Sequence, residues 1–120
     1  MLWVKLGSGF AFLAVALGAF GAHALKSRLT EYSLDIYKTA VLYHLVHALG
    51  LCVVGWLSTL TPDPKINLAG IFMTLGIVLF SGSLYLLAIS QSKWLGAITP
   101  LGGLSFLVSW ALIIFIRFPK

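Results

Sequence analysis

The amino-acid sequence predicts an all-α integral membrane protein, an up-down bundle of four transmembrane helices in a single domain spanning residues 1–120. Two observations predict this class. Hydrophobic residues make up 60% of the chain and charged residues only 9%, whereas a soluble domain carries about 25% charged residues. The apolar residues are also gathered in four long runs without Asp, Glu, Lys or Arg. Helices of about 20 apolar residues are long enough to cross the hydrocarbon layer.

These four runs define the predicted helices. They are Leu6–Leu25, Thr39–Leu60, Leu68–Ile89 and Leu95–Ile116. Each run is apolar on all sides, as is typical of a helix surrounded by lipid. Transmembrane strands would be shorter and would alternate polar with apolar residues. The pattern therefore favours four helical spans.

The first run has a competing interpretation as a secretory signal peptide. Lys5 precedes it, and Ala22-His23-Ala24 near its end imitates a cleavage site. The apolar stretch is longer than the usual 7 to 15 residues of a signal peptide. We therefore expect the first run to be retained as a transmembrane helix.

The connections between the runs predict antiparallel neighbours. The segment Thr61–Lys65 contains two prolines, which end helices, and Ser90–Lys93 is equally short. The first connection is longer, and within it Thr30 is a candidate helix N-cap. An apolar stripe over residues 30–38 predicts a short interfacial helix that runs into the second transmembrane helix.

The distribution of charge excludes some partners. Eight Lys and Arg against three Asp and Glu give a net charge of +5. The cations are scattered along the edges of the apolar runs, where their side chains can reach lipid headgroups. They form no basic face, so we expect contact with the lipid bilayer and none with nucleic acid. Basic residues are equally numerous on the two predicted membrane sides, so the positive-inside rule selects no orientation. The single cysteine excludes an intramolecular disulfide.

Small and polar residues inside the runs are candidates for helix packing or for lining a cavity. These candidates are Gly18, Ala22, Ser81, Gly82, Ser83, Thr99, Pro100 and Gly102. Small residues at four-residue spacing let transmembrane helices approach closely. The two serines can bond to their own helix or line a polar site. Pro100 either kinks the fourth helix or breaks it beside a binding cavity.

All three histidines lie near one predicted membrane face. His23 ends the first run, while His44 and His47 share a face early in the second, with Tyr43 beside them. Four interpretations stay open for this cluster: hydrogen bonds between helices, a metal site, contact with haem or quinone, and a proton or ion relay. No fourth metal ligand is visible, so no metal site is assigned. We expect no cofactor, and haem, quinone or metal is the alternative.

Four sequence blocks resemble a known family. They are Gly18–Leu25, Tyr43–Gly50, Leu79–Tyr85 and Ile98–Gly103. In these blocks the chain resembles domain-of-unknown-function family 423, small bacterial inner-membrane proteins that are similar to the transmembrane protein 256 group of eukaryotes. The resemblance implies a multi-pass protein of a bacterial plasma membrane, with four helices and no established activity. Its motif residues correspond here to His23, His44, His47, Ser81, Gly82, Ser83, Thr99, Pro100 and Gly102, and no catalytic role comes with them.

No motif for enzymatic catalysis is present, since the chain lacks a phosphate-binding loop, a CxxC pair and an HExxH helix. We therefore expect a protein that is not an enzyme. The expected role is that of an accessory or scaffold subunit, bound to a membrane-protein partner or to further copies of itself. The alternative is a small-molecule or ion site built around His23, His44 and His47.

Overall fold

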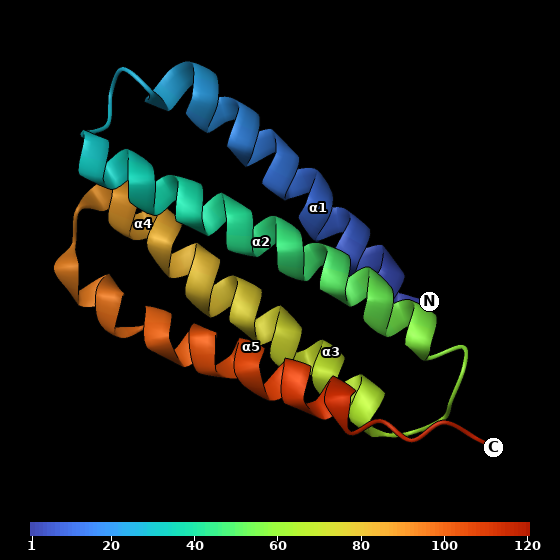
Figure 1. The fold of residues 1–120 in the computed structure, drawn as a ribbon. Helices are drawn as coiled ribbons and strands as arrows, with labels where there is room; N and C mark the ends of the chain where they lie inside the picture. The colour runs from blue at the N-terminus through green and yellow to red at the C-terminus, as the bar shows by residue number, and fades with distance from the viewer.

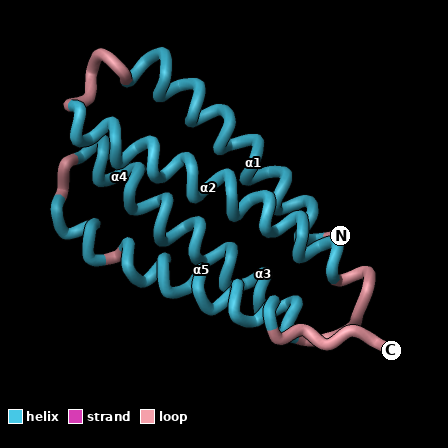
Figure 2. The backbone as a smooth tube through the Cα atoms, viewed as in Figure 1, coloured by secondary structure: helices cyan, strands magenta, loops and turns pink.

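The computed structural model describes residues 1–120, and all of its regular structure is helical (Figures 1 and 2). The elements are α1 (Leu2–Phe20), the π-helical segment η1 (Gly21–Leu25), α2 (Glu31–Leu57), α3 (Lys65–Gly76), the π-helical segment η2 (Ile77–Ser81), α4 (Gly82–Ser90), the 3-10 helix η3 (Lys93–Ala97) and α5 (Thr99–Ile114). They combine into four continuous spans, each long and apolar enough to cross a membrane. The predicted fold class is confirmed.

The second span starts earlier than the sequence predicts. Thr30 caps α2, because its hydroxyl oxygen accepts a hydrogen bond from the backbone N–H of Ser33 at 3.1 Å. The helix then continues without a break from Glu31 to Leu57. Residues 30–38 are thus the cap and first turns of α2, and the separate interfacial helix is not confirmed. The apolar stripe that predicted it belongs to the transmembrane helix itself.

The turn between the second and third spans is held by side chains. Asp63 accepts the backbone N–H of Lys65 at 2.9 Å, where α3 begins. The hydroxyl of Thr61 donates to the carbonyl of Arg117 at 2.7 Å, which ties this turn to the C-terminal segment. At the other end of the molecule, α4 ends at Gln91, whose φ of 58° lies in the left-handed region. Both short connections therefore reverse the chain as predicted.

The four spans lie in a flattened arrangement, with extents of 55 × 26 × 16 Å. α1 packs mainly on α2, α2 packs on α3, η2 and α4, and α5 packs mainly on α3 and η2 (Figure 1). The chain termini lie at the same end of the molecule. As a result, α1 and α5 occupy the two edges, and α2 and the third span lie between them.

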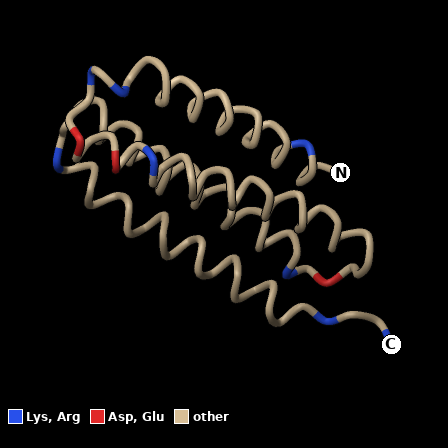
Figure 3. Tube along the Cα trace, turned by 45° about the horizontal axis from the view of Figure 1, so that its top comes forward, with Lys and Arg blue, Asp and Glu red and all other residues tan.

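Lys, Arg, Asp and Glu gather toward the two ends of the molecule and leave its middle uncharged (Figure 3). Large apolar side chains such as Phe12, Leu104 and Leu107 are exposed along that middle section. An exposed apolar belt between two charged ends matches the cross-section of a lipid bilayer.

Close packing between helices depends on small residues. A Cβ added at Gly7 of α1 would lie 2.6 Å from the carbonyl oxygen of Ala48 in α2. A Cβ at Gly102 of α5 would overlap the backbone of Phe80 in η2. The core between the spans contains Leu51, Met73, Ile77 and Phe106. The small-residue faces that the sequence offers are used largely within the chain.

Candidate functional site

His47 lies in the core between α2 and α5 with both ring nitrogens in hydrogen bonds. The indole N–H of Trp110 donates to Nε2 at 3.1 Å, and Nδ1 is 2.7 Å from the carbonyl oxygen of Tyr43. Because an indole N–H can only donate, Nε2 is the acceptor and the ring proton sits on Nδ1. The ring also stacks on Phe106, with centroids 3.5 Å apart. This imidazole is neutral and has no free lone pair for a metal.

His44 is buried in α2 and faces other helices. Its Nδ1 is 2.9 Å from the hydroxyl oxygen of Tyr85 in α4, and its ring meets the edge of Phe10 in α1. Nε2 is buried and has no hydrogen-bond partner. His44 therefore contacts residues of two other helices and carries one ring nitrogen without a hydrogen bond.

His23 is separate from the other two histidines. It lies in η1 and is exposed, whereas His44 and His47 are buried. No group of three or more His, Cys, Asp or Glu side chains is placed to hold a metal ion. His44 and His47 lie three residues apart on α2 but have different partners. His44 contacts Tyr85, and His47 contacts Trp110. The predicted cluster divides into one surface residue and two separate interhelical contacts.

Tyr43 contacts His47 through its backbone carbonyl, and its side chain lies at the edge of the neighbouring aromatic residues. Its carbonyl accepts from His47, and its ring packs on Phe80 with centroids 4.5 Å apart. The ring is 40% exposed, so it lies at the lipid-facing margin of the aromatic group around Phe106.

The serines near mid-membrane bond between helices. Ser81 donates to the carbonyl of Ala40 in α2 at 2.9 Å. Ser83 donates to Phe80 at 3.0 Å within its own span and lies 2.6 Å from the hydroxyl oxygen of Thr99 at the start of α5. The sequence allowed bonding within one helix or the lining of a polar site. The structure adds a third use, hydrogen bonds between helices.

The interruption near Pro100 is a change of helix type. The 3-10 helix η3 ends at Ala97, and α5 begins at Thr99 with Pro100 in its first turn. A proline is tolerated there because the first helical N–H groups have no partner inside the helix. Gly102 then permits contact with the Phe80 backbone, while Gly82 has open space at its Cβ position. No cavity at Pro100 is needed to explain this sequence.

Other polar contacts were missed from the sequence. Ser105 and Ser109 of α5 donate to the carbonyls of Phe72 and Ala69 in α3, each at 2.6 Å. The indole of Trp3 donates to the side chain of Asn67 at 3.0 Å. The available signal was a polar atom inside an apolar run, which needs a partner from another helix or from its own backbone.

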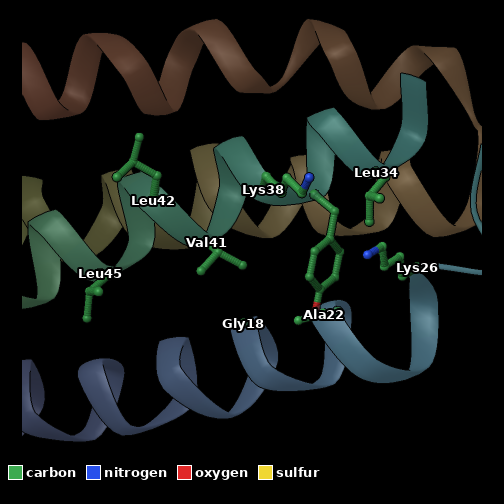
Figure 4. A pocket seen from close by; sticks show the side chains of 10 residues that line it. Gly18, Ala22, Lys26, Leu34, Lys38, Val41, Leu42 and Leu45 are labelled. Carbon is green, nitrogen blue, oxygen red and sulfur yellow. The ribbon is translucent and has the colours of Figure 1, made fainter. Parts of the chain in front are cut away.

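A groove of about 420 Å³ runs between α1 and α2 and contains two of the predicted residues, Gly18 and Ala22. Its wall is mostly apolar, and Lys26 and Lys38 lie at one end of it (Figure 4). Tyr37 also lines it, and the tyrosine hydroxyl donates to the carbonyl of Leu17. This groove is the site with the most defined chemistry: an apolar slot with a cationic end.

The opposite end of the molecule carries the only ion pair, between Asp63 and Lys65 at 3.5 Å. Backbone N–H groups of Lys65 and Arg117 each bond to the Asp63 carboxylate at 2.9 Å. These bonds favour the charged form and hold the pKa of Asp63 below its ordinary value.

Comparison with known proteins gives a consistent result. Residues 17–103 match the family model described as a protein of unknown function, DUF423. The chain is 49% identical to the UPF0382 membrane protein YwdK of Bacillus subtilis, covering 94% of this chain and 93% of the relative. It is 43% identical to a UPF0382 membrane protein of Staphylococcus haemolyticus, covering 98% and 95%. No solved structure matches the chain significantly.

Proposed function

This chain belongs to the DUF423 family of membrane proteins, and we propose that it serves as an accessory or scaffold subunit of a membrane complex. Its relatives are membrane proteins of bacteria, which supports the plasma membrane as its location. The proposed activity is binding: the helices offer a preformed surface to a transmembrane helix of a partner or of a second copy.

The observation that carries this proposal is the exposure of α1. Only 11% of the most apolar stretch of the first span is buried by the rest of the chain, against 50% for α2. The helix contacts mainly α2, so its outer side is free. At Gly9 on that side, nothing lies within 4 Å of the Cβ position. A partner helix could approach the backbone closely there, as transmembrane helices do at small residues.

The buried polar contacts support a rigid scaffold. Hydrogen bonds from Ser81, Ser109 and Trp110 connect different helices inside the apolar region. Each such bond in a membrane protein contributes about 0.6 kcal/mol on average. Together with the close contacts at Gly7 and Gly102, they hold the spans in fixed relative positions, which a scaffold requires.

The test is crosslinking from the outer side of α1. A photoreactive residue replaces Gly9 in one variant and Gly96 of η3 in the other, because both positions are open. In intact membranes we expect a defined crosslinked product from position 9 and none from position 96. Differently tagged copies distinguish a self-association product from one with another protein.

A substitution then tests whether the crosslinked contact is needed. Gly9→Leu should lose the partner in mild detergent, whereas Gly96→Leu should keep it; at both positions nothing of the chain lies within 4 Å of the Cβ position. Recovery of monomer alone from wild-type membranes, with no crosslink at position 9, would overturn the accessory role.

A second candidate function, a small-molecule site, is favoured by one observation, the unpartnered Nε2 of buried His44. A quinone carbonyl or a haem iron could engage that nitrogen. Absorbance spectra, metal analysis and solvent extraction of the purified protein test it. A stoichiometric ligand that disappears in His44→Ala and persists in His23→Ala supports the site. A protein without any such ligand rules it out.

A further inference from the structure

The groove between α1 and α2 combines apolar walls with two cations. Lys26 follows directly after η1, and Lys38 lies two turns into α2. Both line the groove, and Figure 4 shows Lys38 on α2 and Lys26 on the side of the first span. The remaining wall is formed by residues such as Val41, Leu42 and Leu45. A ligand that fits this shape needs an anionic head and an apolar tail.

The groove exists because one wall lacks side-chain bulk. Gly18 of α1 and Gly21 and Ala22 of η1 form the side of the groove that belongs to the first span. A Cβ at Gly21 would overlap the ring of Tyr37. The glycine therefore allows that ring to pack directly against the backbone of the first span. The Tyr37 hydroxyl is already bonded to the Leu17 carbonyl, which fixes the ring as part of the wall. The opening is thus a stable part of the packing between α1 and α2.

Neither lysine makes an ion pair within the protein. The single ion pair of the chain, Asp63 with Lys65, lies at the opposite end. Glu31 and Asp35 belong to the same end as the groove but make no ion pair with either lysine. Lys26 and Lys38 both adjoin the apolar parts of their spans, at the level where lysine side chains meet lipid headgroups. Two unpaired cations there form a site for an anion.

We infer that this groove binds one anionic phospholipid. The lipid phosphate lies between the ammonium groups of Lys26 and Lys38, and an acyl chain lies along Val41 and Leu45 beside Gly18. Charge complementarity selects the anionic headgroup, and basic pockets between transmembrane helices are known to suit such headgroups. The volume of about 420 Å³ falls in the usual range for ligand pockets, roughly 300–1,000 Å³. This inference is independent of the proposed scaffold role, which concerns the outer side of α1.

The headgroup part is tested by native mass spectrometry of the full chain in mixed phosphatidylglycerol and phosphatidylcholine. The wild type should retain phosphatidylglycerol preferentially, and the preference should fall about fivefold for each lysine removed in Lys26→Gln and Lys38→Gln. The matched control for the double variant Lys26→Gln/Lys38→Gln is Lys5→Gln/Lys93→Gln, which removes the same two charges at lysines outside this groove. It should keep the preference.

The acyl-chain part is tested by filling the groove. Ala22→Leu places an apolar side chain in it, whereas Ala19→Leu adds the same bulk on an exposed part of α1 outside it. Only Ala22→Leu should reduce lipid retention, and soluble glycerol phosphate should bind far more weakly than the lipid. Equal retention of both lipids by the wild type would overturn the inference. So would an equal loss in Lys5→Gln/Lys93→Gln, or unchanged retention in Ala22→Leu.

Discussion

The indole N–H of Trp110 in α5 donates to Nε2 of His47 in α2, with the two nitrogens 3.1 Å apart. This contact sets the protonation pattern of the histidine, because it leaves Nδ1 to donate to Tyr43. It also joins α2 to α5, as does the stacking of the His47 ring on Phe106. The histidine that the sequence offered as a ligand thus serves as a structural acceptor.

Trp110→Phe should destabilise the protein by about 0.6–1.7 kcal/mol, because it leaves the buried Nε2 of His47 without a donor. Chemical unfolding in mild detergent, followed by circular dichroism, measures this change. Trp94→Phe is the matched control, since Trp94 is 67% exposed. Equal stability of the Trp110 and Trp94 variants would show that the bond contributes nothing.

Gly102→Ala should destabilise the protein by about 1–3 kcal/mol, the usual result of overpacking a core. A Cβ there would meet the backbone of Phe80, which cannot turn away as a side chain could. The neighbouring Gly103→Ala is the control. Its Cβ would lie 3.7 Å from the Phe80 ring, an ordinary contact, so its stability should stay within about 0.5 kcal/mol of the wild type. The same unfolding assay compares the two, and the opposite ranking would contradict the packing described.

The double variant Ser105→Ala/Ser109→Ala should lose about 1 kcal/mol of stability, because two hydrogen bonds from α5 to α3 disappear. The lost hydroxyls are small, so little cavity forms. Ser8→Ala/Ser27→Ala removes two hydroxyls from exposed positions and should leave the unfolding midpoint unchanged. If both double variants unfold alike, the α3–α5 hydrogen bonds do not stabilise the bundle.

Asp63 should make stability depend on pH in the acid range. Two backbone N–H groups hold its pKa in the folded protein below the ordinary value of 3.8. The Asp63 carboxylate therefore stabilises the folded protein fully at a pH above its pKa in the unfolded chain. This contribution is lost as the pH falls through the lower pKa that Asp63 has in the folded protein. Thermal unfolding measured from about pH 6 down to about pH 3 should show this loss. Asp63→Asn should flatten the curve, and Asp35→Asn, at an exposed carboxyl, should not.

The number of spans and the short connections could be predicted because they depend on residues in sequence order, whereas α2 starts at Glu31, before the predicted Thr39. The capping residue Thr30 and the turn from Thr61 to Lys65 act locally, and the apolar runs are set by membrane thickness. The family resemblance was likewise carried by contiguous blocks, and the match over residues 17–103 confirms it.

The rotation of each helix about its axis could not be predicted. In lipid, outward and inward faces are both apolar, so hydrophobic periodicity does not reveal which side is buried. His44 and His47 illustrate this: their spacing was known, but not that one meets Tyr85 and the other Trp110. The π-helical turns η1 and η2 also left no signal that sequence patterns could use. His23 lies in η1 and Phe80 lies in η2.

The order of packing along the chain has a consequence for biogenesis. α1 packs mainly on α2, α2 packs on α1 and on the third span, and the third span packs on α2 and α5. During synthesis, each newly emerging segment after the first finds its neighbour already inserted. Contacts between successive segments form readily because little loop entropy is lost. The ribosome can therefore deliver this protein one hairpin at a time, and no segment has to wait exposed for a distant partner.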